Sequence, residues 1–175
     1  MTTKTRDLES NHIRSDKDPL EVRNILLSKI EALQDDAIAK YRTIQQKSTY
    51  SNVKEIVEGL IAAAEKEKQI VKELKEADVA DSARGHDVSS SKLEGSLFEH
   101  LLESDNARPK ENDIGAVIMY ALNISTKLNT IYYILLNEYN HSAIKGSFRT
   151  LQEIENSKIR KLDKLYENLI VKGAY

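Results

Sequence analysis

The sequence has no cysteine, and its 175 residues include only two prolines and six glycines. The absence of cysteine excludes disulfides, thiolate nucleophiles, zinc ribbons and cysteine-ligated iron sites. The scarcity of helix-breaking residues accompanies long segments rich in Leu, Ile, Ala, Glu and Lys, a composition typical of helices. Alternation of apolar and polar residues, the pattern of a half-buried strand, is nowhere sustained. The sequence therefore predicts an all-α protein.

Long apolar runs are also missing. No run reaches the roughly 18 apolar residues that a membrane helix needs, and the polar residues 1–17 contain no apolar stretch of a signal peptide. The net charge is −2 with 31% charged residues, which favours neither nucleic acid nor an anionic membrane as a partner. We expect a soluble, cytoplasmic protein with a disordered tail at 1–17 and a single domain at 18–172.

Four segments carry apolar residues at helical spacing and are predicted to be long helices. Their ranges are 18–47, 52–77, 113–138 and 148–169. The first begins at Asp18, an N-cap followed by Pro19 at the first helical position. Hydroxyl residues at 48–51 are predicted to cap the second helix, and Ser147, which follows Gly146, is predicted to cap the fourth.

The connections between these segments predict how the helices are arranged. Short turns join the first pair and the last pair, so the members of each pair are expected to be antiparallel neighbours. Residues 78–112 form a long crossover, in which Ser91 and Glu94 form a capping box for a short extra helix at 93–103. Four long helices with one long crossover describe an antiparallel four-helix bundle of ferritin-like connectivity.

Each predicted helix has a line of apolar residues at heptad spacing, here called its seam, and each seam is interrupted by a polar residue near mid-length. The apolar seam of the fourth helix is Phe148, Leu151, Leu162, Leu165 and Leu169. The interruptions are Gln34, Glu67 and Ser125 in the first three helices, and Glu155 with Lys158 in the fourth. Because the middles of the helices meet at similar height in a four-helix bundle, these residues are predicted to form one buried polar layer.

The spacing of these residues resembles that of the rubrerythrin branch of the ferritin-like superfamily. Its first and third helices carry a ligand glutamate with a tyrosine seven residues later, and its second and fourth helices carry a glutamate with a histidine three residues later. The matching pairs here are Gln34 with Tyr41, Ser125 with Tyr132, Glu67 with Ile70, and Glu155 with Lys158. The resemblance covers about residues 18–169 outside the crossover. It implies a four-helix bundle whose mid-height residues hold two iron or manganese ions.

Only two carboxylates of that ligand set are present here, Glu67 and Glu155. We therefore expect a bundle that has lost its di-metal centre, has no cofactor and no catalytic residue, and serves as a structural or protein-interaction module. In this hypothesis the Lys158 ammonium neutralises Glu67 or Glu155 and substitutes for the charge of the metal. Further hydrogen bonds are expected from Gln34, Ser125, Tyr41 and Tyr132.

Two other functions are compatible with the sequence. One is a rubrerythrin-type oxidoreductase with an atypical iron or manganese site on Glu67 and Glu155. The other is a helical adaptor unrelated to ferritins, whose seams pair with the helices of another protein. For an interaction role, the expected partner is a second copy of the chain in a homo-dimer, or another protein.

Simpler interpretations of single residues also exist. Glu155 and Lys158 could form an exposed pair, with the buried face of the helix passing through Ile154, Ile159 and Tyr166. The four histidines, His12, His86, His100 and His141, have no spacing of paired helical ligands and are expected to be scattered surface residues. A metal contact at Glu99, His100 and Glu103 is a weaker possibility.

Overall fold

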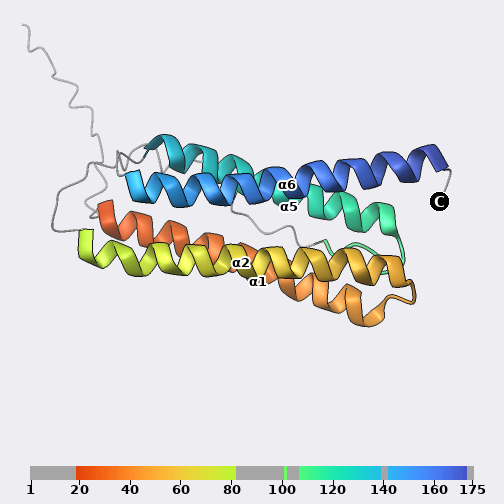
Figure 1. Ribbon diagram of the computed structural model, residues 1–175. Coiled ribbons are helices and arrows are strands. Elements are labelled where there is room, and N and C mark those ends of the chain that lie inside the picture. Colours follow the sequence, from red (N-terminus) through yellow and green to blue (C-terminus); the bar gives the residue numbers. More distant parts are fainter. Residues whose placement is uncertain (1–18, 82–100, 102–106, 139–141, 173–175) are drawn as a thin grey trace, which may run out of the picture.

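The computed structural model describes residues 19–81, 101, 107–138 and 142–172. These residues form four long helices lying side by side: α1 at Pro19–Lys47, α2 at Ser51–Asp81, α5 at Ile114–Glu138 and α6 at Ser142–Lys172 (Figure 1). The prediction of an all-α four-helix bundle is confirmed over this part of the chain. The predicted tail at 1–17 and the interior of the crossover, with its short helix at 93–103, lie outside the described residues except for Leu101.

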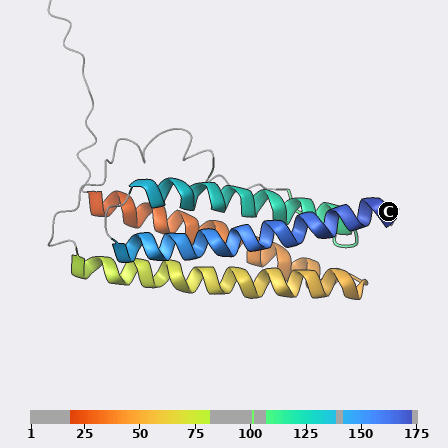
Figure 2. The same ribbon diagram turned by 45° about the horizontal axis from the view of Figure 1, so that its top comes forward.

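The helices pack as two hairpins. α1 packs against α2, α5 packs against α6, and α2 also contacts α6 and α5. Figure 2 shows α6 lying between α5 and α2. The pairing of chain neighbours follows from the two short turns, as the sequence predicts.

Asn112 fixes the direction of α5. Its Oδ1 accepts hydrogen bonds from the Thr49 N–H at 3.0 Å, from Ser48 Oγ at 3.2 Å and from Thr49 Oγ1 at 3.3 Å. The start of α5 therefore lies beside the turn between α1 and α2. Since α2 also begins at that turn, α2 and α5 run in the same direction, and the end of α2 lies at the opposite end of the bundle from the start of α5 (Figure 1).

Three helix ends lie at or next to the residues where the sequence predicts them. The Ala116 N–H donates to Asp113 Oδ1 at 2.9 Å, so Asp113 caps α5 where the sequence predicts a start. Ahead of α2, the Tyr50 N–H donates to Ser48 Oγ at 3.2 Å. α1 ends at Lys47, as predicted.

The predicted start of α6 is wrong, because the helix begins at Ser142 and Ser147 lies inside it. A glycine such as Gly146 costs a helix about 1 kcal/mol relative to alanine. The longer helix, however, packs half-buried Ile144 together with fully buried Phe148 against the core. Ser147 Oγ donates to the Ala143 carbonyl at 3.4 Å, so its hydroxyl bonds to the helix instead of capping it. The packing of Ile144 and Phe148 therefore outweighs the local preference of Gly146 and Ser147 for a helix start.

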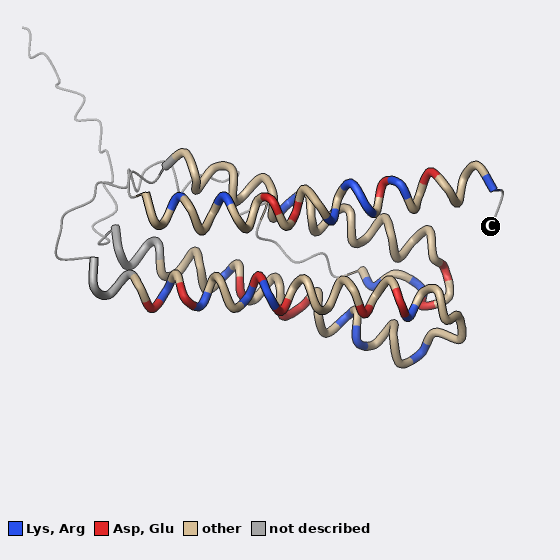
Figure 3. Tube along the Cα trace, in the orientation of Figure 1, with Lys and Arg blue, Asp and Glu red and all other residues tan. Residues whose placement is uncertain are grey.

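The core receives apolar side chains from all four helices. α5 is the least charged of them, since only Lys127 and Glu138 are charged among its 25 residues. Figure 3 shows both signs of charge interspersed along α2 and α6. No helix within the described ranges has an apolar stretch long enough to cross a membrane.

The seam of α6 is buried as predicted at Phe148, Leu151 and Leu162, but Leu165 is 37% exposed and its predicted burial is wrong. An α-helix has 3.6 residues per turn, so a heptad seam rotates by about 20° per heptad, and its end turns away from the core.

The link between Asn112 and the first turn gives a test of the fold. Asn112→Ala removes the acceptor of three hydrogen bonds from Ser48 and Thr49. We expect the free energy of unfolding, measured by urea titration, to fall by about 1 kcal/mol. The control Asn123→Ala changes an exposed asparagine in the middle of α5 and should leave stability unchanged or slightly higher. Equal stability of the Asn112 variant and the parent would contradict this role.

Candidate functional site

Five polar side chains are buried in the described part of the bundle: Gln34, Ser48, Glu67, Ser125 and Glu155. Ser48 belongs to the first turn, and the other four lie on the seams of the four helices. We use the name polar layer for Gln34, Glu67, Ser125 and Glu155 together with Tyr41, Tyr132 and Lys158. Gln34 and Tyr41 come from α1, Glu67 from α2, Ser125 and Tyr132 from α5, and Glu155 and Lys158 from α6. The layer thus draws on every helix of the bundle.

Lys158 lies between the two carboxylates. Its Nζ is 2.7 Å from Glu67 Oε1 and 2.8 Å from Glu155 Oε1. Both glutamates are completely buried, and the lysine side chain is 13% exposed. The interpretation of Glu155 and Lys158 as an exposed surface pair is therefore wrong. Charge-assisted contacts of this length are stronger than neutral hydrogen bonds, and burial protects them from screening by salt.

Gln34 and Tyr132 complete the surroundings of Glu67. Gln34 Nε2 donates to Tyr132 Oη at 2.9 Å and lies 3.4 Å from Glu67 Oε2. The Tyr132 hydroxyl donates to the same carboxylate oxygen at 3.4 Å. Glu67 is thus contacted from α1, α5 and α6, so one buried side chain connects its own helix to the other three.

Burial and repulsion act on the protonation of Glu155. Burial raises the pKa of Glu155 well above its usual value, and the negative charge of Glu67 raises it further, while Lys158 acts in the opposite direction. Burial lowers the pKa of Lys158, but the two carboxylates outweigh burial and leave that pKa raised. The ammonium therefore stays charged at neutral pH, and the layer favours a proton on Glu155.

Buried acceptor atoms without a hydrogen-bond donor also favour a proton on Glu155. Among the described residues, no donor reaches Gln34 Oε1 or Glu155 Oε2, and both atoms are buried. Glu67 Oε1 and Glu155 Oε1 have no conventional hydrogen bond either, but both contact the Lys158 ammonium. A proton on Glu155 would turn one acceptor into a donor and lower the cost of burying this group.

The two tyrosines of the layer are held as neutral phenols. Burial raises the pKa of Tyr132 and of Tyr41 well above the usual value, and the charges of Glu67 and Glu155 add to the effect. The ring of Tyr41 packs edge-on against Tyr120, with ring centroids 5.8 Å apart. Tyr120 is a buried neighbour of the layer that the seam analysis missed. Its spacing of three residues from Val117 and four from Ile124 is the helical pattern that marks it as buried.

Hydrogen bonds and ion pairs of the layer join Gln34, Glu67, Tyr132, Glu155 and Lys158. Tyr41 and Ser125 are also buried. These residues do not form the ligand set of a di-metal site. Ile70, which is half-buried, and Lys158 stand where that set has histidines, and Gln34 and Ser125 stand where it has glutamates. Within the described ranges, no three His, Asp or Glu side chains are placed to hold a metal ion. The histidines and the Glu99–Glu103 segment lie outside those ranges.

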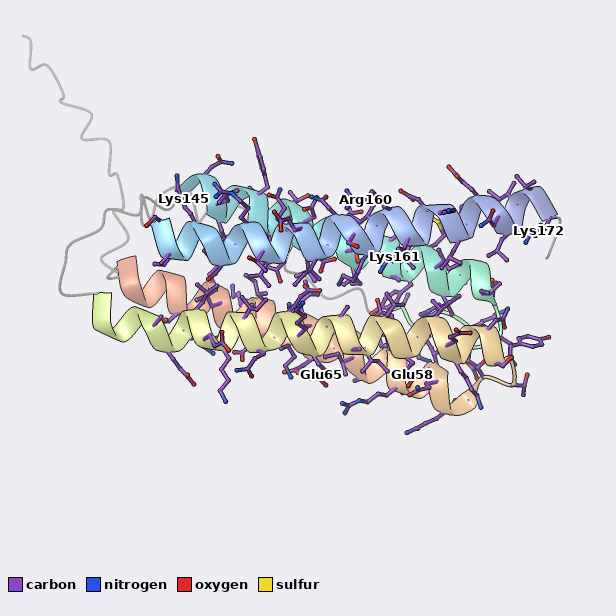
Figure 4. All side chains as sticks on the ribbon, in the orientation of Figure 1. Glu58, Glu65, Lys145, Arg160, Lys161 and Lys172 are labelled. Atoms are coloured by element: carbon purple, nitrogen blue, oxygen red, sulfur yellow. The ribbon has the colours of Figure 1, made fainter. Side chains whose placement is uncertain are left out.

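The central ion pairs give the first test of the layer. Lys158→Met removes the cation and leaves two carboxylates buried without a counter-charge, so we expect the free energy of unfolding to fall by about 3–5 kcal/mol. The matched control Lys161→Met changes an exposed lysine of the same helix (Figure 4) and should stay within about 0.5 kcal/mol of the parent. A Lys158 variant as stable as the parent would show that the carboxylates need no internal cation.

The raised pKa of Glu155 predicts how stability depends on pH. A carboxyl whose pKa is higher in the folded state binds its proton more tightly there. Its contribution to stability is complete below the unfolded pKa of about 4.3 and is lost as the pH rises through the folded value. The groups that face Glu155 are Glu67, Lys158, Tyr41 and Tyr132. Lys158 and the two tyrosines keep their protons over this pH range because their pKa values are raised.

Glu155→Gln isolates this effect, because the amide does not titrate. Between pH about 5 and about 8, we expect the parent to lose more unfolding free energy than the Glu155→Gln variant, as measured by urea titration at each pH. The matched control Glu153→Gln changes an exposed position of α6, and its unfolding free energy should change with pH as that of the parent does. If the unfolding free energies of the parent and of Glu155→Gln change equally with pH, the pKa of Glu155 is not raised.

Comparison with known proteins does not assign the chain to a family. It matches no protein-family model, no curated protein and no solved structure.

Proposed function

We propose that this protein is a ferritin-like bundle, related to rubrerythrins, in which an internal lysine has replaced the di-metal centre, and that it acts as a structural or protein-interaction module. The observation that carries the proposal is the position of Lys158. Its ammonium contacts Glu67 and Glu155, one from each of two facing helices, at 2.7 and 2.8 Å. A cation is thus supplied by the chain at the place where the carboxylates of a ferritin-like site would bind metal.

The connectivity supports the first half of this proposal. α2 and α5 run in the same direction and are joined by one long connection, which is the arrangement of ferritin-like bundles. The polar residues also occur at the spacing of that family, with Glu67 and Ile70 on α2 and Glu155 and Lys158 on α6. Fold and spacing are independent features, since many four-helix bundles have other connections and apolar centres.

The chemistry of the side chains argues against a metal in the same place. Two divalent ions require several anionic or imidazole ligands, whereas the layer offers two carboxylates, an amide and a hydroxyl. A metal ion would also have to displace the Lys158 ammonium or accept repulsion from it at close range.

A structural role follows from what the layer does within the bundle. It connects all four helices through Gln34, Glu67, Tyr132 and Lys158. A slip of α2 or α6 along its axis would separate buried charges. A slip of α1 or α5 would break the hydrogen bonds of Gln34 or Tyr132. The layer therefore favours a single register of the four helices. The resulting rigid bundle can present its surface to a partner without a cofactor.

The second candidate is the atypical oxidoreductase, with iron or manganese on Glu67 and Glu155. The observation in its favour is that both carboxylates share one cation and so lie close together across the bundle. Anaerobic equilibrium dialysis against iron(II) and manganese(II) separates the two functions. We expect no tightly bound metal in the parent protein. Stoichiometric uptake that is lost in Glu67→Gln would favour the oxidoreductase and contradict the loss of the metal centre.

Restoring the absent ligands tests the ferritin-like relationship itself. A variant with Gln34→Glu, Ile70→His, Ser125→Glu and Lys158→His has the complete ligand pattern of a di-metal carboxylate bundle. We expect it to be less stable than the parent without metal, because it buries four carboxylates without Lys158, and to regain stability when iron(II) or manganese(II) is added. Thermal unfolding with and without metal provides the measurement.

The control for this variant replaces the same positions without creating ligands, as Gln34→Met, Ile70→Leu, Ser125→Ala and Lys158→Met. Its melting temperature should not depend on added metal. If the restored variant is also insensitive to metal, these positions do not converge as they do in a ferritin-like site, and the proposed relationship fails.

A further inference from the structure

Of the neighbouring helices in the described part of the chain, α1 and α5 pack least closely. α1 packs against α2, α2 against α6 and α6 against α5, which leaves α5 and α1 as the last neighbours around the bundle (Figure 2). Long side chains bridge these two helices. The ring of Tyr41 lies edge-on to Tyr120, and Gln34 Nε2 donates to the hydroxyl of Tyr132.

The apolar side chains between α1 and α5 are nevertheless buried. We use the name α1–α5 side for Leu33 and Lys40 of α1 together with Tyr120, Lys127 and Ile131 of α5. Lys40 Nζ lies 5.6 Å from the centre of the Tyr120 ring, and the other residues follow these two at helical spacing. Tyr120 is 7% exposed, and Ile131 is completely buried. Burial beside a loosely packed pair of helices indicates that another part of the chain covers these side chains.

The described residues of the crossover lead to the α1–α5 side. Leu101 is helical and half-buried, and it packs against the core. Ala107 and Pro109 line an open cavity of about 580 Å³ together with Met119 and Tyr120 of α5. Because six residue steps span at most about 20 Å of extended chain, Leu101 packs against the core within that distance of Ala107. The crossover therefore contacts the bundle close to Tyr120.

The sequence around Leu101 supplies a second apolar surface. Within the predicted helix at 93–103, Leu97, Phe98 and Leu102 lie at helical spacing from Leu101 and share its face. On the opposite side of such a helix are the polar residues Glu99, His100 and Glu103. A helix in which Leu101 faces the core therefore directs its other large apolar residues toward the bundle and its two glutamates away from the core.

Charge complementarity supports the same segment as the cover. The α1–α5 side carries Lys40 and Lys127, and exposed Lys29 lies three helical turns before Lys40 on the same side of α1. Asp36, which lies toward this side as well, is paired with Lys40 at 2.8 Å. The polar side of the 93–103 segment is acidic, so opposite charges meet at the border of the apolar contact.

We propose that residues 93–103 form a helix that lies along the α1–α5 side of the same molecule, with Leu101 facing the core and its two glutamates near the lysines of α1 and α5. In this position the crossover completes the core between the two helices. It also shields Tyr41 and Tyr120, at the edge of the polar layer, from water. A second copy of the chain is not needed as the cover, because Leu101 packs against the core and is joined to Ala107 by only the residues 102–106.

This inference goes beyond the proposed function and does not rest on the ferritin-like relationship. The metal experiments and the experiments below can therefore fail independently. The inference also limits where a partner can bind in the proposed interaction role. Since the chain itself covers the α1–α5 side, a protein partner contacts the other faces of the bundle.

Cross-linking of introduced cysteines tests the position of the segment in the full chain, which has no cysteine of its own. His100→Cys places a thiol on the polar side of the proposed helix. It is combined with Lys29→Cys on α1 or with Lys127→Cys on α5, and each double variant is treated with a short bismaleimide. We expect a cross-link within one molecule for both pairs, identified by mass spectrometry of the digested monomer.

The matched controls combine His100→Cys with a cysteine on a helix that does not border the α1–α5 side. Glu73→Cys on α2 and Arg149→Cys on α6 are both exposed positions. Their intramolecular cross-linking should be at least about tenfold slower, because the effective concentration of the two thiols is lower. Equal rates for all four pairs would overturn the proposal. Cross-links that form only between two molecules would overturn it in favour of a second copy as the cover.

Tryptophan fluorescence tests which face of the segment points inward, since the chain has no tryptophan. Phe98→Trp places the indole on the apolar face, and the matched control His100→Trp places it on the polar face. We expect the emission of Phe98→Trp to be shifted to shorter wavelength and to be quenched less by acrylamide, because its indole is buried. Circular dichroism of each variant establishes that it is folded. Equal emission and equal quenching of the two variants would overturn the proposed docking.

Discussion

The structure depends on the burial of two carboxylates around one ammonium. A fully buried glutamate is among the least favourable side chains to place in a core, and this bundle contains two, Glu67 and Glu155, that share the single cation Lys158. The three groups carry one negative charge in excess if both carboxylates are ionised. Burial raises the pKa of Glu155, and this excess of negative charge raises it further. The excess also makes the loss of Lys158 more costly than the loss of an ordinary surface lysine.

This arrangement connects the fold to the proposed function. A ferritin-like bundle with a di-metal centre gathers carboxylates at mid-height and relies on metal ions to neutralise them. In the proposed function, two buried carboxylates lie at this height, share the ammonium of Lys158 and need no metal ion. The surface of the bundle then provides the contact with a partner.

Much of the fold could be predicted from the sequence, because heptad spacing and caps act locally. The end of α1 at Lys47 and the start of α5 beside Asp113 were marked by residues that the structure uses in the expected way. The start of α6 could not be predicted from Gly146 and Ser147, since the packing of Phe148 and Ile144 outweighs their local preference. The exposure of Leu165 follows from the rotation of a heptad seam around an α-helix, which a strict heptad assignment leaves out.

The residues of the polar layer and the role of Lys158 as its cation could be predicted from the heptad seams, whereas the individual hydrogen bonds and distances could not. Nothing in the spacing says that Gln34 donates to Tyr132, or that Lys158 reaches Glu67 on another helix as closely as Glu155 on its own. The central claim is that Lys158 provides the counter-charge for Glu67, and a double-mutant cycle with Lys158→Met and Glu67→Gln measures it most directly. The account predicts a coupling free energy of about 2 kcal/mol or more, with the double variant more stable than the sum of the single effects implies. A coupling near zero would contradict it.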